Sequence, residues 1–368
     1  MRTSLSNNNI ALDLPSSHST HTADNQAHHT PVVLSPRLHN KDLAPTKAEG
    51  RRWGRYSIFA LWTNDVHNIA NYSFAIGLYA LGLGGWQILL SLGIGAALVY
   101  FFMNLSGYMG QKTGVPFPVI SRISFGIHGA QIPALIRAVI AIAWFGIQTY
   151  LASVVFRVLL TAVHPGFADY DHNSILGLST LGWVCFVAIW FVQLAILAYG
   201  MEMVRRYEAF AGPVILLTVA ALATWMYTQA DATIAVLILP WNLYNSPLVI
   251  VYFLSGLGAL LGLLYGVIMV DYWLVRKGQV NVPQLYSEDP NGAYYYSRGV
   301  NLRAVAAFIP AALIAIVLAL VPGFHSVSPF SWLIGAGIAG MLYLIIAKRQ
   351  PHYADVSGEA IAVDNVSH

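Results

Sequence analysis

The feature that most constrains this chain is a series of long apolar stretches, each sufficient to cross a lipid bilayer. A hydrocarbon core about 30 Å thick is crossed by about 20 helical residues that rise about 1.5 Å each. Only 10% of the 368 residues are charged and 57% are hydrophobic, whereas soluble domains have about 25% charged residues. Because lipid offers no hydrogen-bond partners to the backbone, such stretches form helices. The sequence therefore predicts an all-α, polytopic membrane protein.

The spacing of charged residues and prolines divides these stretches into eight spans. The run 232–270 is interrupted by Pro240 and Pro247, which leaves one full span in its second half. The run 304–347 is divided by Pro322 and Pro329, because proline interrupts a continuing helix. The predicted spans are 57–82, 86–108, 131–160, 175–200, 209–228, 248–270, 304–321 and 329–347.

The positive charges give these spans an orientation. With the N-terminus in the cytoplasm, the loops assigned to the outside, near 83–85, 163–174, 229–247 and 322–328, contain no Lys or Arg. Lys and Arg gather instead in the cytoplasmic segments, as the positive-inside rule requires, and only Arg157 departs from the pattern. We therefore expect a multi-pass protein of the inner (plasma) membrane, surrounded by lipid, with both termini cytoplasmic.

The two ends of the chain differ from the apolar middle. Residues 1–50 are rich in Ser, Thr, Asn, His and Pro and show no apolar periodicity, so we expect a disordered polar tail, and residues 350–368 form a second one. The histidines of the first tail match no metal-ligand spacing. A net charge of +3 is too small to suggest a nucleic-acid partner. The single Cys185 excludes an intrachain disulfide.

The first span contains an unusual run of polar residues. Asn64, Asn68 and Asn71 share one helical face, with Asp65 and His67 between them. An acid at the centre of a span costs about 2.5–3.5 kcal/mol, so this face must look into the protein or a wet cavity. Asn and Asp also compete for backbone hydrogen bonds, so the span could unwind locally and expose carbonyls to a cation. The alternative is a set of hydrogen bonds between helices that holds the bundle together.

The third span presents an aromatic ring and an amide on one face. Trp144 and Gln148 are four residues apart, and Gly146 between them leaves room for close approach. A flat aromatic surface beside an amide suits a planar ring that forms hydrogen bonds. Packing within the bundle is the alternative interpretation of this pair.

A stripe of small residues marks the sixth span. Gly258, Gly262 and Gly266 recur every four residues, which is typical of a close contact between helices.

Several ordered segments carry a family resemblance. They are 62–77, 85–87, 110–118, 121–126, 144–149, 206–208, 211–213, 240–241, 271–277 and 284–286, which read WTNDVHNIANYSFAIG, GWQ, GQKTGVPFP, SRISFG, WFGIQT, RYE, AGP, PW, DYWLVRK and QLY. In these segments the chain resembles the nucleobase:cation symporter-1 family, over about 50–230 and 236–350. Members of that family carry uracil, cytosine, allantoin, hydantoins or related compounds with Na⁺ or H⁺.

The resemblance implies a LeuT-type fold of twelve helices, ten of which form two inverted repeats, with the substrate between broken helices. It implies that Trp144 stacks on the substrate ring, Gln148 hydrogen-bonds it, and Asn68 also contacts it. Backbone carbonyls at Asn64 and His67 would hold part of the cation. Asp65 is a possible proton carrier. No resident metal and no organic cofactor is implied.

The order of the motifs departs from the family at one place. The fifth span ends near Gln229, and Pro240-Trp241, a motif from the end of the family's ninth helix, follows within a few residues. The resemblance therefore implies that helices six to eight and most of nine are missing and that the second repeat is incomplete. We accordingly expect helices one to five in 51–230 and helices ten to twelve in 231–349. Four missing helices is an even number, which leaves every remaining span in its family orientation.

The resemblance predicts a secondary transporter and not an enzyme, and no P-loop, zinc-ligand spacing or nucleophile elbow is visible in the sequence. The alternative is a truncated, transport-inactive membrane protein of the same family. A third possibility is a dimer in which two copies complete each other's binding site, although the sequence itself indicates no oligomeric state.

Overall fold

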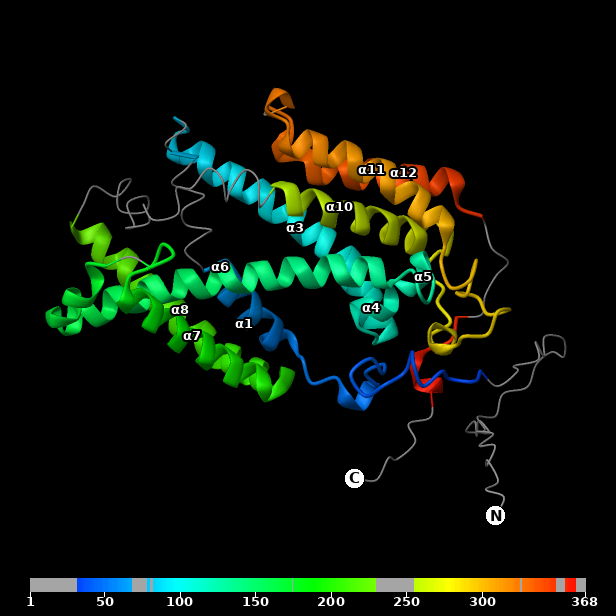
Figure 1. Ribbon diagram of the computed structural model, residues 1–368, viewed down its shortest axis with the longest axis horizontal. Coiled ribbons are helices and arrows are strands. Elements are labelled where there is room, and N and C mark those ends of the chain that lie inside the picture. The colour runs from blue at the N-terminus through cyan, green and yellow to red at the C-terminus, as the bar shows by residue number, and fades with distance from the viewer. Residues whose placement is uncertain are drawn as a thin grey trace, which may run out of the picture. The chain divides into compact units, whose positions relative to one another are not determined.

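The computed structural model describes residues 32–67, 78–79, 82–173, 175–229, 255–324, 326–348 and 355–361 (Figure 1). Within them, seven helices are long and apolar enough to cross a membrane, and each matches one of the predicted spans after the first. Their bounds are α3 (Gly85–Thr113), α6 (Gln131–Val163), α7 (Thr180–Ala198), α8 (Gly200–Gln229), α10 (Ser255–Met269), which continues into a π-helical turn (Val270–Val275), α11 (Leu302–Leu320) and α12 (Ser331–Ile346).

The first predicted span begins as the helix α1 (Arg55–Val66). It ends within the run of polar residues: Asn64 and Asp65 are still helical, His67 is the C-cap, and the His67 N–H donates to the Thr63 carbonyl at 3.3 Å. An ending at this point agrees with the competition of Asn and Asp side chains for backbone hydrogen bonds. Asn68 and Asn71 lie outside the described residues, so the rest of this span stays a prediction.

The chain divides into two compact units that interleave along the sequence. One unit contains 1–51, 101–137 and 248–368, and the other contains 52–100 and 138–247. α3 and α6 each contribute residues to both units. This packing division differs from the predicted division at residue 230, which concerns the correspondence of helices to the family's repeats and remains a prediction.

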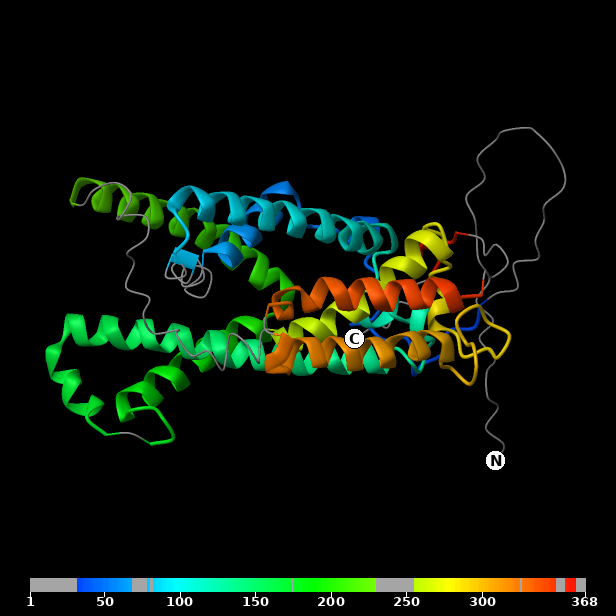
Figure 2. The ribbon, with the colours of Figure 1, turned by 90° about the horizontal axis from the view of Figure 1, so that it is seen from above.

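In the first unit α10, α11 and α12 pack side by side, and Figure 2 shows them from a second direction. Small residues make the α10–α12 contact possible. A Cβ added to Gly262 would lie 2.4 Å from the Trp332 carbonyl oxygen, and one added to Gly266 would lie 2.1 Å from the Ala336 carbonyl oxygen. The predicted close contact is therefore confirmed at these two glycines. It is wrong at Gly258, where an added Cβ would meet open space. Gly262 already meets Trp332, next to the first residue of α12, so Gly258 lies one turn beyond the start of the partner helix.

Short elements and loops cover one end of this three-helix group. Gly126 has a φ of +87°, and an added Cβ there would lie 2.5 Å from the Gly299 carbonyl oxygen, so only glycine fits this crossing of two loops. The short elements of the first unit are α4 (Phe117–Ile120), α5 (Arg122–Phe125), and the 3-10 turns Ala48–Gly50, Pro283–Tyr286, Pro322–Phe324, Ser328–Phe330 and Gly358–Ala360.

Residues 32–50 correct the prediction of a disordered tail over 1–50. The Ser35 N–H donates to the Tyr286 carbonyl at 2.8 Å, and the Thr46 N–H donates to the Gly114 carbonyl at 2.8 Å. Leu38 is buried, and Leu34 and Leu43 pack against the same core. Three leucines within ten residues supply the apolar surface for this packing, although their spacing has neither helical nor strand periodicity. Residues 1–31 lie outside the described part of the chain.

Part of the C-terminal tail is likewise packed, in contrast to the expectation for 350–368. The Val356 N–H donates to the Val280 carbonyl at 3.1 Å, and Ile361 is buried. The Glu359 carboxylate accepts from the Ala48 N–H at 2.7 Å, so the described parts of the two tails contact each other.

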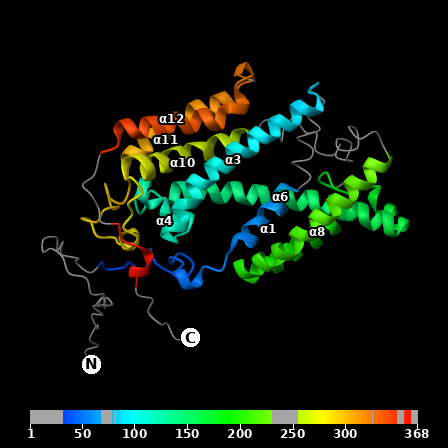
Figure 3. The ribbon, with the colours of Figure 1, turned by 180° about the vertical axis from the view of Figure 1, so that it is seen from behind.

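In the second unit α1 packs along α8, as the view in Figure 3 also shows. The Tyr56 hydroxyl donates to the Ala209 carbonyl at 2.8 Å. Gly212 permits the close approach, because its added Cβ would lie 3.3 Å from the Ala60 Cα. A 3-10 helix (Pro165–Asp171) connects α6 towards α7.

Arg157, the one residue that departs from the predicted charge pattern, has a partner in that connection. Its guanidinium lies 3.2 Å from the Asp171 carboxylate. The pair is half-buried, so the Arg157 charge is compensated locally. Arg157 remains an exception to the positive-inside rule, because that rule counts Lys and Arg and not net charge.

Candidate functional site

The polar residues of α1 meet α8 at one specific contact. The Asn64 Nδ2 donates to the backbone carbonyl of Glu208 at 3.1 Å. The other amide atom, Asn64 Oδ1, is buried and has no hydrogen-bond partner in the described structure. The same holds for the Glu208 Oε2 atom. Two buried oxygens without donors thus accompany this helix contact, and buried polar groups of this kind are rare in folded proteins.

The neighbours of Asn64 on α1 have different surroundings. The Asp65 side chain is exposed, and its carboxyl group interacts electrostatically with that of Glu208. His67 is half-buried at the end of α1, where the helical hydrogen-bond pattern stops. Asn68, predicted to contact the substrate, lies outside the described residues. The predicted roles of Asn64 and His67 as backbone cation ligands, and of Asp65 as a proton carrier, remain predictions.

The predicted pair on the third span lies in the middle of α6. Trp144 and Gln148 are both half-buried, one helical turn apart. Gly146 between them faces open space, since an added Cβ would meet no atom within 4 Å. Gln148 forms no hydrogen bond with any residue that the structure describes. Its amide is therefore available to a ligand beside the Trp144 ring. Gly146, two residues from each, points to the other side of α6 and does not adjoin this face.

A hydrogen bond to α7 fixes the rotation of α6 next to this pair. Thr149 is fully buried, and its hydroxyl donates to the Gln193 Oε1 at 2.7 Å. Because Thr149 follows Gln148 directly, this bond holds the buried side of α6 against α7 and leaves Gln148 on an adjoining side. Trp144, Gln148 and Asn64 all belong to the second unit, but the hydrogen bond of Asn64 goes to α8 and not to α6.

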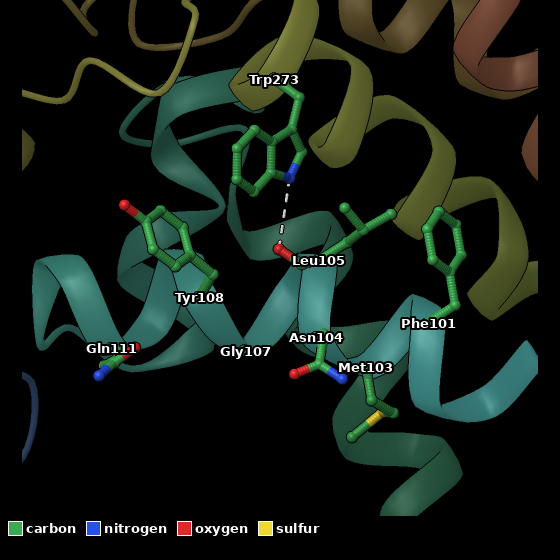
Figure 4. Close-up of a pocket in the computed structure, with 8 residues that line it drawn as sticks. All are labelled: Phe101, Met103, Asn104, Leu105, Gly107, Tyr108, Gln111 and Trp273. Carbon is green, nitrogen blue, oxygen red and sulfur yellow. Dashed lines mark hydrogen bonds between the residues drawn. The ribbon is translucent and has the colours of Figure 1, made fainter. Parts of the chain in front are cut away.

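A separate hollow of about 410 Å³ lies in the first unit, on α3 and the end of α10 (Figure 4). Trp273 forms one wall, and its ring lies 5.4 Å from the Tyr108 ring. Its indole N–H donates to the Leu105 carbonyl at 3.3 Å. The hollow is mostly apolar and contains none of the predicted site residues, so it does not support the predicted substrate site. Its lining residues are Phe101, Met103, Asn104, Leu105, Gly107, Tyr108, Gln111 and Trp273.

A buried ion pair lies at the π-helical turn that follows α10, and no role was predicted for it from the sequence. The Arg276 Nε lies 2.9 Å from the Asp271 carboxylate, and these side chains are only 7% and 1% exposed. The Ser124 hydroxyl donates to the same carboxylate at 2.9 Å, and the Tyr343 hydroxyl donates to it at 3.0 Å. The available signal was an acid within an apolar run, five residues before an arginine.

The surroundings of this ion pair make it a structural tie. The Arg276 Nη2 also donates to the Ile123 carbonyl at 2.9 Å and to the Tyr296 hydroxyl at 2.5 Å. Burial alone would lower the pKa of Arg276, but the neighbouring Asp271 carboxylate holds the pKa well above its ordinary value. Every described group in the cluster has a partner, so the cluster joins α5, the π-helical turn and α12 and offers no free group to a ligand.

Comparisons with known proteins agree with this architecture. The family model described as "Permease for cytosine/purines, uracil, thiamine, allantoin" matches residues 45–233 and 228–335. An allantoin permease of Bacillus subtilis (strain 168) is 26% identical, over 91% of this chain and 97% of the relative. The purine-uracil permease NCS1 of Arabidopsis thaliana is 24% identical, over 86% of this chain and 79% of the relative.

A solved structure shares the fold. It is that of Mhp1, a nucleobase-cation-symport-1 family transporter, in a closed conformation with bromovinylhydantoin bound. The TM-score is 0.64 at 17% identity, and the match covers 84% of this chain and 95% of that chain. The fold is therefore the predicted all-α, LeuT-type transporter fold.

The comparisons also fit an internal gap. The alignment with the Bacillus subtilis permease runs over 482 residues, although this chain has only 368. The two matched segments of the family model meet at residues 228–233, next to the predicted gap at 229–239. The chain is thus consistent with an internally shortened membrane transport protein of the nucleobase:cation symporter-1 type, and it belongs to the family of permeases for cytosine/purines, uracil, thiamine and allantoin.

Proposed function

We propose that this chain binds a nucleobase or related ring, such as uracil, cytosine, allantoin or hydantoin, and carries it across the membrane with Na⁺ or H⁺. The observation that carries the proposal is the face of α6. There the Trp144 ring lies one turn from the Gln148 amide, which has no hydrogen-bond partner among the described residues. The family supports the same class of cargo, because its members are permeases for such rings.

The chemistry of this face suits a planar amide-containing ring. Trp144 offers a broad aromatic surface for offset stacking. Gln148 offers two N–H donors and one carbonyl acceptor, the complement of a lactam or ureide edge. Asn68 would add a third polar contact from the segment after α1. These groups suit several heterocycles equally, so the proposal names a class of ring.

Uptake of radiolabelled uracil, allantoin and hydantoin by cells that express the 368-residue chain tests the proposal. We expect saturable uptake that depends on a cation gradient. Trp144→Ala should reduce ring affinity at least about tenfold, because each tenfold step corresponds to about 1.4 kcal/mol. The matched control is Trp190→Ala on α7, which is 38% exposed in the same unit. Equal uptake by both tryptophan variants would contradict the role of Trp144.

The internal gap favours a second candidate, a transport-inactive membrane protein of the same family. More than a hundred alignment positions have no counterpart in this chain, since the alignment covers 482 residues and the chain has 368. A transporter that alternates between two bundles needs both walls of its site. Ring binding to the purified protein that is lost in Trp144→Ala, combined with no uptake in cells, would support this candidate.

A further inference from the structure

We propose that Glu208 supplies a side-chain oxygen to the coupling cation at α1, together with the amide oxygen of Asn64. The inference rests on the proposed function, because a symporter needs a cation site. It adds a carboxylate from α8 to a site for which the family resemblance implied backbone carbonyls of the first span as part of the ligand set.

The helices α1 and α8 are in direct contact at Asn64 and Glu208. Asn64 Nδ2 donates to the Glu208 carbonyl at 3.1 Å, so the amide of Asn64 lies against the backbone that carries the Glu208 side chain. One turn and two turns earlier on α1, Ala60 touches Gly212 and the Tyr56 hydroxyl donates to the Ala209 carbonyl. These contacts hold Asn64 and Glu208 at the same level of the α1–α8 interface.

One side-chain oxygen of each of these two residues lacks a hydrogen-bond partner within the part of the chain that the structure describes. Asn64 Oδ1 and Glu208 Oε2 are both buried, and neither has a hydrogen-bond donor among the described residues. A buried carboxylate oxygen without a partner is costly, as is a buried amide oxygen. These two oxygens belong to residues that meet at one helix contact, and oxygen ligands are what a hard cation prefers. The two oxygens are both acceptors, so they cannot form a hydrogen bond with each other. A small cation could bind to both.

The charged side chains that the structure describes near Glu208 leave its carboxyl group without a basic partner. The two arginines nearest to Glu208 along α8 are paired elsewhere: Arg205 and Arg206 lie 2.6 Å and 3.1 Å from the Glu202 carboxylate. The Asp65 carboxyl group interacts electrostatically with that of Glu208. The segment 68–77, which follows α1, contains no charged residue. No described Lys or Arg thus neutralises Glu208, and the surroundings favour a cation.

The chemistry points to a monovalent ion of the size of Na⁺. The described residues contain no group of three or more His, Cys, Asp or Glu side chains that could hold a metal, so a transition metal or a multidentate Ca²⁺ site is a poor fit. One carboxylate and one amide oxygen, completed by carbonyls where α1 ends, leave the ion weakly held, which a transport cycle requires.

Thermal unfolding of the purified chain in detergent, in NaCl against KCl at equal ionic strength and without substrate, tests the inference. A ligand that binds only the folded state raises the midpoint in proportion to its occupancy. We expect Na⁺ to raise the midpoint of the wild-type chain and of Asp169→Asn, a control that removes an exposed carboxylate of the same unit. Glu208→Gln should need at least about ten times more Na⁺ for the same rise.

A wild-type midpoint that is the same in NaCl and KCl would overturn the inference, and so would a full Na⁺ response in Glu208→Gln. If Glu208→Gln does not fold, Glu208→Asp keeps the charge on a shorter side chain and should shift the Na⁺ dependence while retaining a response. An unchanged Na⁺ dependence in that variant would also overturn the inference. Because no uptake is measured, a chain that binds Na⁺ but does not transport remains distinguishable from one without the cation site.

Discussion

Removing the charge of Asp271 should destabilise the protein more than any surface substitution, because the Arg276 guanidinium would then be buried without its anion. Asp271→Asn keeps the size of the side chain. It replaces one of the carboxylate oxygens, which accept from Arg276, Ser124 and Tyr343 at 2.9 Å, 2.9 Å and 3.0 Å, with an NH₂ group. At least one of these donors would then face another donor.

The expected magnitude follows from the burial of the pair. The two side chains are 1% and 7% exposed, so solvent does not screen their interaction. Breaking such a pair by removing one partner costs about 3–5 kcal/mol. Replacing both charges at once, as in Asp271→Leu with Arg276→Met, should cost less than the single changes together, since the double variant leaves no buried charge.

The assay is unfolding in detergent micelles followed by tryptophan fluorescence, with Asp355→Asn as the matched control. Asp355 forms an ion pair with Lys112 at 2.6 Å, but the two side chains are 42% and 32% exposed. Such a pair contributes at most about 1 kcal/mol. Equal losses of unfolding free energy in Asp271→Asn and Asp355→Asn would refute the assignment of Asp271 as a buried tie.

Two further predictions concern packing and pH. Gly266→Ala should reduce the unfolding free energy by about 1–3 kcal/mol, because its Cβ would lie 2.1 Å from the Ala336 carbonyl oxygen, whereas Gly258→Ala should be neutral or slightly stabilising in the same unfolding assay. Tyr286→Phe removes a hydrogen bond of 2.6 Å to the Leu43 carbonyl and should cost about 1 kcal/mol. Burial also raises the pKa of Tyr286. Above the ordinary tyrosine pKa of about 10, the unfolded chain therefore loses this proton more readily than the folded chain. The unfolding free energy of the wild-type protein should fall as the pH rises, and that of Tyr286→Phe should fall less steeply.

The spans were predictable from the sequence because length and hydrophobicity decide them without knowledge of any partner. Seven predicted spans reappear as helices, since an uncharged run such as 304–321 has no other stable structure in lipid. The packed tail around Leu38 was not predictable in the same way. Its stability depends on the Tyr286 carbonyl and the Gly114 carbonyl, which lie far along the chain and carry no signal near the tail.

The candidate site was predictable only where its residues share one helix. Trp144 and Gln148 are four apart, so helical periodicity alone places them on one face. The contact between Asn64 and Glu208 joins residues separated by 144 positions, and that between Ser124 and Asp271 joins residues separated by 147. Periodicity says nothing of such pairs. Polar residues inside spans were thus recognisable as important, while their partners required the fold.

Because the candidate site lies on one side of the predicted gap, ligand binding and transport can be measured separately in this chain. The face of α6 and the α1–α8 contact both lie before residue 230, on the N-terminal side of the predicted gap at 229–239. The shortening leaves both features in the described structure, so a ring could still bind Trp144 and Gln148, and a cation could still bind Glu208. Transport, in contrast, requires that both ligands be released on the other side of the membrane, through movement against the second repeat, which is predicted to be incomplete in this chain. If the shortened chain binds ring and Na⁺ with ordinary affinity but shows no uptake, the missing helices are needed for the movement and not for recognition. If it also fails to bind the ring, the first wall of the site is insufficient by itself, and the stacking surface of Trp144 depends on the opposite wall for its affinity.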